Sequence, residues 1–483
     1  MRKIALLGLL SASGMIASAA KNPPTFHIRL DVPLTSYDSP AGTAFTATVI
    51  SPLEIGGQSI IPQGSLIHGT VIRASAVGLG LVHERAMLEL AFHEYELAEG
   101  HRYPFGARLE FVENAREQVD SRGRIKGVLA ASNPQGLLRG IWYRPSDDFF
   151  SRSAIGLTGL GGALWSHFSL GPVGAAGMLA ARYIAFPLPE PEIQLPSGTE
   201  MRLLATSIPE DAPSTPVLPN PSVGESLAAW LQTQSRAVTR PDGTPAADVV
   251  NLAFIGNAEE LQNAFTAAGW VAAEPRTLHS LSTTYRAYNS MRGYSTAPVS
   301  TLLYQQAEPM VVFQKSFNTI AKRHHIRIWR AGLFEGNEVW VGAATQDAGV
   351  GFQRRSRTIT HKIDPQTDRE RRKVVMDLSF AACSQRVSFL DRSPDAEAAA
   401  EAAQDTWIQT DGRLAVIWLQ QCAGNYPDDD SPMQSPGSKT KRMARRFILE
   451  TRQYFLRDNM YYWVYRATRL GLTTTFRGTS NAE

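Results

Sequence analysis

The stretch Lys322–Asp347 reads KRHHIRIWRAGLF, then EGNE, then VWVGAATQD, and it predicts a β-hairpin. Hydrophobic and polar residues alternate in both arms, and the Gly336-Asn337 pair favours a tight turn between them. Because side chains along a strand alternate between its two faces, His324 and His325 are expected on opposite faces. The hairpin is therefore expected to be the central element of its domain.

The register of this hairpin is expected to bring a histidine and an aspartate together. If the turn pairs Phe334 with Asn337, regular pairing places His324 opposite Asp347. A slip of one residue would separate them. Neighbouring imidazole and carboxylate groups of this kind suit acid–base catalysis.

A second histidine and aspartate follow the hairpin. His361 lies three residues before Asp364, where Asp364-Pro365 predicts the start of a helix. Two imidazoles with two carboxylates suit Zn²⁺ or acid–base chemistry, although the spacing matches no known metal motif. The alternative is that Asp364 only caps the helix. The candidate catalytic residues are His324, His325, Asp347, His361 and Asp364, and the candidate metal ligands are His324, His361 and Asp364. No cofactor other than this zinc ion is indicated.

Positive charge is concentrated around the hairpin. The chain of 483 residues has a formal net charge of +3, yet Lys315–Lys373 contains 13 Lys and Arg against 6 Asp and Glu, a local charge of +7. The remainder of the chain therefore carries −4. Arginine offers paired donors to phosphate, so an anionic ligand is one interpretation, and a solvated basic face is the other. The candidate anion-binding residues are Lys322, Arg323, Arg354, Arg355, Arg357 and Arg371.

The first 19 residues predict a secretory signal peptide. Two basic residues precede the apolar run Ile4–Ile16, and Ala17–Ala19 provides small residues for cleavage. We therefore expect export to the periplasm or cell envelope, where a nucleic-acid partner is disfavoured. In an oxidising compartment, Cys383 and Cys422 either form a disulfide or remain as two buried thiols.

Residues 20–205 are predicted to form a mostly-β module, either a small barrel or a sandwich. Pro-X-Gly-Thr/Ser sequences beginning at Pro40, Pro62 and Pro196 favour turns that lead directly into strands. Residues 153–186 interrupt the module with glycines spaced by three. We expect this insertion to form Gly-rich apolar helices that pack on the module or on another copy of the chain. A membrane-inserted hairpin is the alternative.

A Pro-rich linker is predicted over residues 206–245, with a short helix inside it. The pattern then changes to an α/β (α+β) domain over residues 246–420. Within that domain, Asn257 followed by Glu260 predicts a capped helix start. Residues 421–483 form a C-terminal extension that contains a basic helical pattern.

Two parts of the chain resemble known families. The segment Ile61–Gly69 resembles the TrbI-type β-barrel of secretion channels. Residues from about 248 to 420, roughly a third of the chain, resemble the LssY C-terminal domain family. The blocks that carry this second resemblance are Asn251–Gly256, Ala267–Trp270, Thr296–Ser300, Phe313–Lys315, Arg323–Arg330, Val339–Ala344, Gly349–Gly351 and Thr360–Pro365.

In the LssY family the domain often follows bacterial membrane proteins of the DedA or lipid-phosphatase type, whereas here it follows a predicted exported β module. The resemblance implies no catalytic mechanism. Such neighbours do make a phospholipid headgroup or a polyanionic glycan a reasonable ligand.

These observations favour a non-enzymatic, exported envelope protein that binds an anionic ligand, at a membrane surface or on another envelope component. No GxSxG sequence, P-loop or dinucleotide-binding glycine pattern is present. The second interpretation is a metal-dependent phosphoester hydrolase that uses the histidine cluster. The third is a structural envelope scaffold. The Gly-rich segment 153–186 also offers a surface for self-association.

Overall fold

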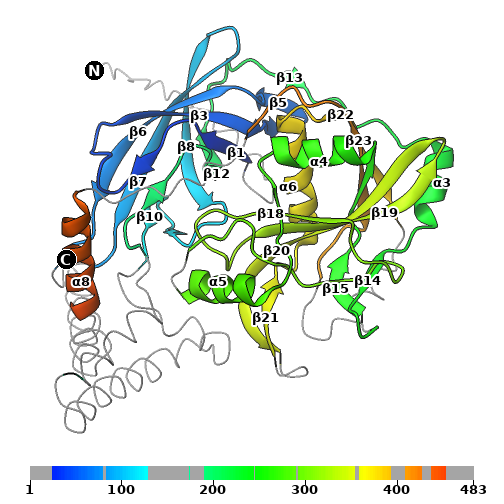
Figure 1. Ribbon diagram of the computed structural model, residues 1–483. Helices are drawn as coiled ribbons and strands as arrows, with labels where there is room; N and C mark the ends of the chain where they lie inside the picture. The colour runs from blue at the N-terminus through cyan, green and yellow to red at the C-terminus, as the bar shows by residue number, and fades with distance from the viewer. Residues whose placement is uncertain are drawn as a thin grey trace, which may run out of the picture.

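A computed structural model describes residues 24–79, 83–128, 173, 190–243, 245–289, 292–353, 358–392, 408–426 and 437–452. The predicted signal peptide and, apart from residue 173, the Gly-rich segment 153–186 lie outside the described residues. Within these ranges a β-barrel is followed by a second domain with a mixed sheet and helices (Figure 1). No helix in the described ranges is long and apolar enough to cross a membrane.

Strands of the N-terminal module close into an antiparallel barrel, so the predicted β module is a barrel and not a sandwich. The order around the ring is β6-β3-β1-β12-β8-β7, and pairing of β6 with β7 closes it. Inward-facing side chains such as Phe26, Ile28, Tyr95 and Leu203 are fully buried in its core. The barrel strands are β1 (Thr25–Leu30), β3 (Ala44–Ser51), β6 (Leu66–Ser75), β7 (Met87–Glu96), β8 (Arg102–Val112) and β12 (Glu200–Ser207). Shorter strands accompany them, namely β2 (Leu34–Thr35), β4 (Leu53–Ile55), β5 (Gln58–Ile61), β9 (Gln118–Val119), β10 (Ile125–Lys126), β11 (Gln194–Leu195) and β13 (Thr215–Pro216).

The three Pro-X-Gly turns each start a barrel strand, as the sequence predicts. In each turn the residue after the glycine donates its N–H to the proline carbonyl, closing a four-residue turn. The glycines Gly42, Gly64 and Gly198 have φ between 87° and 91°. Strands β3, β6 and β12 each begin two residues after the glycine. Local turn chemistry therefore fixes where half of the barrel strands start.

The second domain is built on a sheet with the strand order β17-β18-β19-β20-β16-β23-β22. Strands β16 and β23 are parallel, and the other described pairs are antiparallel. Helices α4 and α6 cover one face through Phe265, Val374 and Leu378, while α3 covers the other through Leu227 and Leu231. The strands are β14 (Ala237–Thr239), β15 (Pro245–Val249), β16 (Leu252–Ile255), β17 (Val271–Ala272), β18 (Val311–Lys315), β19 (His324–Phe334), β20 (Asn337–Gln353), β21 (Thr358–Ile363), β22 (Ser384–Asp391) and β23 (Arg413–Leu419). The helices are α3 (Glu225–Gln232), α4 (Ala258–Ala267), α5 (Leu278–Asn289), α6 (Thr367–Phe380) and, in the extension, α8 (Lys439–Arg452).

Part of the stretch 206–245 belongs to the second domain instead of acting as a linker. It contains α3 and β14, whose Leu231 and Val238 are fully buried in that domain's core. The prolines dominate the composition of this stretch, but the few apolar side chains between them decide where it packs. At the other end of the domain, Cys383 and Cys422 form a disulfide.

The start of α4 follows the predicted capping box. The Asn257 side chain accepts a hydrogen bond from the Glu260 backbone N–H at 2.9 Å, and the Glu260 carboxylate accepts one from the Asn257 backbone N–H at 2.8 Å. Two backbone donors at the helix start are thereby satisfied. Helix α6, by contrast, begins at Thr367 and not at the predicted Asp364-Pro365.

The central hairpin forms as predicted from β19 and β20. Its turn residues, Glu335 and Gly336, both have positive φ, as a two-residue hairpin turn of this kind requires. Beyond the end of β19, β20 continues and pairs with β21. This β20–β21 arm extends toward the lower side of Figure 1, near α5, while α8 lies at the left of the view.

A β-bulge changes the register along the hairpin. The pairing set by the turn holds from Phe334 back to Gly332, and one extra residue then stands between Gly332 and Arg330 on β19. His324 therefore lies opposite Gln346, so the predicted pairing of His324 with Asp347 is wrong. From Arg330 back to His324, each residue of β19 therefore lies opposite the β20 residue one position earlier in the chain than the turn alone would predict.

Candidate functional site

His324 and His325 point to opposite faces of β19, as the alternation predicts. His324 Nδ1 lies 2.6 Å from Glu370 Oε2 on α6, and its Nε2 lies 3.8 Å from Glu113 Oε2, just after barrel strand β8. Burial alone would lower the pKa of His324, but the Glu370 carboxylate raises it. His324 is thus a buried histidine between carboxylates of the two domains.

His325 belongs to a separate buried group on the other face. Its Nε2 lies 2.9 Å from Thr345 Oγ1, and its Nδ1 lies 3.9 Å from Asp347 Oδ1. The order hydroxyl, imidazole, carboxylate is that of an activated nucleophile. However, Thr345 is 0% exposed, and Asp347 accepts a hydrogen bond of 2.7 Å from Arg323 Nε. A substrate has no access to this hydroxyl, so the group functions as a buried polar network.

The described side chains do not assemble the predicted metal site. The bulge separates His324 from Asp347, and Asp364 Oδ1 accepts a hydrogen bond of 2.9 Å from the Gln366 backbone N–H. No group of three or more His, Cys, Asp or Glu side chains in the described part of the chain is placed to hold a metal ion. His361 lies on β21 with its backbone opposite Val350, and its side chain is outside the described set.

Three of the six predicted anion-binding residues make internal contacts instead. Arg323 is buried against the Asp347 carboxylate. Arg371 forms a two-point pair with Asp411, with N–O distances of 2.7 and 2.8 Å. Lys322 donates to the Ala115 carbonyl of the barrel at 2.9 Å. The other three candidates, Arg354, Arg355 and Arg357, belong to the connection between β20 and β21 and lie outside the described residues.

A closed ring of four charges joins the barrel to the second domain, and sequence reasoning missed it. Glu200, the first residue of β12, accepts hydrogen bonds from Lys315 at 2.7 Å and Lys373 at 2.6 Å. Asp377 accepts from the same two lysines, and its Oδ2 also accepts from the Trp270 indole at 2.9 Å. Against the effect of burial, the lysines hold the pKa of Glu200 well below its ordinary value. The ring balances its own charge, so it favours one arrangement of the two domains.

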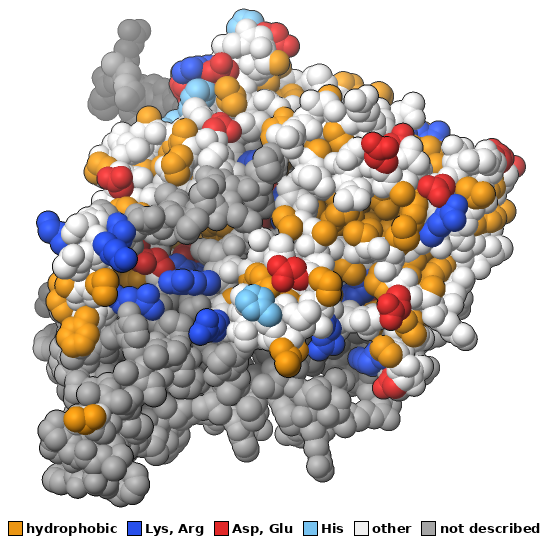
Figure 2. Space-filling model, in the orientation of Figure 1, with side chains coloured by type: hydrophobic (Ala, Val, Ile, Leu, Met, Phe, Trp, Pro, Cys, Tyr) orange, Lys and Arg blue, Asp and Glu red, His pale blue; other side chains and the backbone are white. Residues whose placement is uncertain are grey.

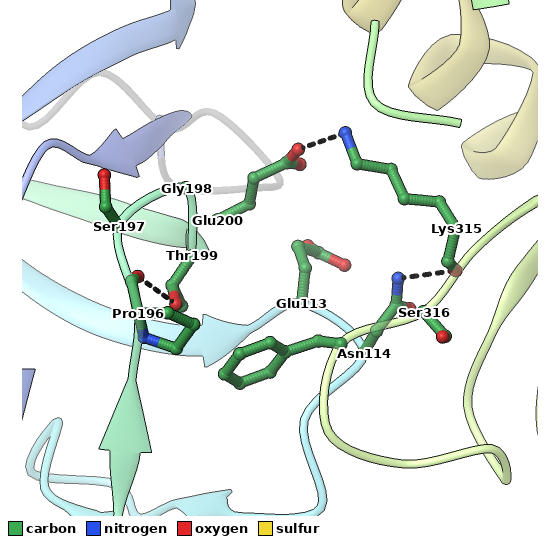
Figure 3. A pocket seen from close by; sticks show the side chains of 10 residues that line it. Glu113, Asn114, Pro196, Ser197, Gly198, Thr199, Glu200, Lys315 and Ser316 are labelled. Atoms are coloured by element: carbon green, nitrogen blue, oxygen red, sulfur yellow. Dashed lines mark hydrogen bonds and ion pairs between the residues drawn. The ribbon is translucent and has the colours of Figure 1, made fainter. Parts of the chain in front are cut away.

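A small cavity lies beside the ring at the junction of the two domains (Figure 3). Its volume is about 40 Å³, and the turn Pro196–Thr199 lines it together with Glu113, Lys315 and Ser316. Burial raises the pKa of Glu113, and the buried Ser316 hydroxyl has no hydrogen-bond partner among the described residues. This volume has room for a few water molecules, which could hydrate the buried polar groups that line it.

Basic side chains gather where α8 meets the rest of the molecule. Arg445 of α8 donates to the buried Glu192 carboxylate of the barrel module. Loss of hydration, together with the nearby positive charges of Arg446 and Arg116, lowers the pKa of Arg292, which follows α5. Figure 2 shows Lys and Arg side chains next to hydrophobic ones over α8, at the left of the view. Part of this positive charge is neutralised within the protein, because Arg116 donates to the Glu117 carboxylate at 3.1 Å. The Glu190 carboxylate also partly offsets the lowering of the Arg292 pKa.

The comparisons with known proteins bear on the second domain. The model of the family described as LssY C-terminus matches residues 231–414, from the end of α3 to the second residue of β23. No curated protein sequence matches the chain. The TrbI-type resemblance of the barrel stays a prediction. The matched range begins earlier than the predicted one, which agrees with the burial of Leu231 and Val238 in the core of the sheet domain. The second domain of this chain is therefore an LssY C-terminal domain.

Proposed function

We propose that this chain is an exported protein of the cell envelope that binds an anionic envelope component without catalysing a reaction. The observation that supports it best is a basic cluster beside α8. Lys439 and Lys441 are exposed there, and burial together with the positive charges of Arg446 and Arg116 lowers the pKa of the neighbouring Arg292. Arginine donates to phosphate or carboxylate oxygens through a planar pair of N–H groups, so such a cluster favours those ligands. The expectation of export rests on the predicted signal peptide at residues 1–19.

The placement of the other charged residues supports binding over catalysis. Arg323 and Asp347 neutralise each other below the surface, and His324 is paired with Glu370. The Thr345 hydroxyl, which has a histidine beside it, is completely buried. A hydrolase is therefore the weaker candidate, because its base, acid and nucleophile must reach a substrate.

Binding of the full mature chain to two anionic probes tests this proposal. The probes are phosphatidylcholine vesicles containing phosphatidylglycerol, and heparin as a soluble polyanionic glycan. Measurements at about 0.15 M salt limit the contribution of screened long-range attraction. Arg292→Glu reverses a charge in the cluster, and Arg276→Glu makes the same change at the other end of α5. We expect roughly tenfold weaker binding from Arg292→Glu and no change from Arg276→Glu.

Two further outcomes decide between this proposal and its alternatives. If Arg354→Glu/Arg355→Glu removes binding and Arg292→Glu does not, the ligand binds at the β20–β21 connection and the cluster beside α8 is not the site. If neither probe binds at any salt concentration, the proposal fails and a structural scaffold is the better account. Export is tested separately, since mature protein in an envelope fraction should begin near Ala20.

A further inference from the structure

Helix α8 has a well-defined inner face. Leu449 is 2% exposed and belongs to the core cluster of the barrel. Arg445, one turn earlier, donates to Glu192 and to the Val77 carbonyl, the latter at 2.9 Å. Residues three or four apart share one side of a helix, so Arg442 faces the same way and is partly buried. The arginine-rich side of α8 is therefore the side that packs on the protein.

The outer face of α8 is apolar. Met443, Phe447 and Ile448 are 63%, 69% and 43% exposed, and Ala444 beside them is exposed as well. The i, i+4 spacing aligns Met443 with Phe447 and Ala444 with Ile448, which makes a continuous stripe along the helix. A helix on the surface of a globular protein ordinarily turns its apolar side inward. Leu449 follows that rule, but Met443, Phe447 and Ile448 of α8 do not, because they face outward.

Exposed lysines border this stripe. Lys439 stands one turn before Met443, and Lys441 lies on the other edge, three residues before Ala444. At 100° per residue, the stripe occupies the arc between these two lysines. A lysine has a long aliphatic stem, so its ammonium group can reach anionic headgroups while the neighbouring side chains enter an apolar layer.

We propose that α8 lies on the surface of an anionic phospholipid bilayer, with Met443, Phe447 and Ile448 inserted at the boundary between headgroups and acyl chains. This inference rests on the proposed function and names its ligand. An apolar stripe bordered by lysines is the pattern of an interfacial helix, and the basic borders are complementary to anionic lipid. Arg445 and Leu449 hold the inner side of α8 against the protein, so only its outer side would enter the interface and the helix would lie in the plane of that interface.

The test uses the full mature chain and vesicles of phosphatidylcholine with or without phosphatidylglycerol. Met443→Ser/Ile448→Ser removes apolar area from the stripe without touching the inner face. Met310→Ser/Leu333→Ser is the matched control, because these side chains are 68% and 59% exposed but lie in the LssY domain. Both double variants should keep the melting temperature of the parent, since all four side chains are exposed.

The stripe variant is expected to bind anionic vesicles at least tenfold more weakly, while the control variant binds as the parent does. Heparin binding should be unchanged in the stripe variant, because a soluble glycan offers no apolar layer. Equal vesicle binding by stripe variant, control and parent would overturn the inference. So would concentration-dependent dimers that the stripe variant abolishes in the absence of lipid, because the stripe would then cover a second copy. Neither result affects the proposed function, which fails only if the protein binds neither anionic vesicles nor heparin.

Discussion

Lys373 of α6 donates to Glu200 of barrel strand β12 at 2.6 Å, although 173 residues separate them in the chain. The same Glu200 carboxylate also accepts from Lys315, so one barrel residue neutralises two lysines of the LssY domain. Against the effect of burial, Asp377 and Glu200 raise the pKa of Lys373. The junction of the two domains is therefore ionised on both sides at neutral pH, and its stability depends on each member of the ring.

Glu200→Gln should destabilise the protein strongly. The change leaves Lys315 and Lys373 buried with only the Asp377 carboxylate between them, and breaking a buried pair in this way costs about 3–5 kcal/mol. Urea unfolding at pH 7 measures the loss. Glu110→Gln is the control, since Glu110 pairs with Arg202 at 3.5 Å on the partly exposed barrel surface, and such a pair contributes about 0–1 kcal/mol. Similar losses in the two variants would contradict the role of the ring.

Gly198→Ala should cost more than Gly42→Ala, although the two glycines occupy equivalent turns. Both have φ near 90°, so alanine at either position is strained by about 1–2 kcal/mol. A Cβ on Gly198 would also lie 2.7 Å from Arg29 Nη2, whereas a Cβ on Gly42 would meet nothing within 4 Å. Arg29 would have to move away from Glu200, which it approaches to 3.6 Å. Thermal unfolding of both variants checks the order, and equal losses would show that Arg29 adjusts freely.

His27 should make the protein less stable as the pH falls from 6.5 to 4. Burial lowers its pKa to about 4, with Lys373 and Arg202 adding to the effect, while the imidazole of the unfolded chain titrates near 6.5. In that window only the unfolded state binds the proton, so unfolding is favoured by roughly 2 kcal/mol as acid is added. His27→Gln should remove this loss in urea titrations at pH 6.5 and 4.

His324 titrates in the opposite sense and serves as the internal control. Its pKa is raised in the folded state. Its contribution to the stability of the folded protein is therefore fully present below pH 6.5 and is lost as the pH rises through the pKa of the folded state. The loss of stability that accompanies rising pH should therefore persist in His27→Gln, because it comes from His324. An acid-side loss that is unchanged in His27→Gln would show that other groups cause it.

Reduction of the Cys383–Cys422 disulfide should destabilise the protein by about 4 kcal/mol. The bond closes a loop between residues 39 apart, which restricts the unfolded chain. The measurement compares urea unfolding with and without dithiothreitol. The Cys383→Ser/Cys422→Ser variant should show the lower stability in both conditions, and a response of that variant to the reductant would point to another cause.

Features encoded by a few adjacent residues could be predicted from the sequence. The Pro-X-Gly turns, the Asn257 cap and the Gly336 hairpin turn all depend on backbone preferences of neighbouring residues, and each is present. The bulge after Arg330 could not be predicted, because no local pattern marks the extra residue, and it moved His324 away from Asp347. Ring members such as Glu200 and Lys373 were missed for a different reason. Their partners lie in another domain, and a single sequence carries no signal for such contacts.

Hydrogen–deuterium exchange on the full chain, with and without anionic vesicles at about 0.15 M salt, tests the central claim most directly. The account predicts slower exchange in Lys439–Leu449 and in the residues just after α5, with no change at the hairpin turn Glu335-Gly336. Neutral vesicles should leave all three regions unchanged. Protection confined to regions far from α8, or no protection with anionic vesicles to which the protein demonstrably binds, would contradict the claim that this end of the molecule meets the anionic surface.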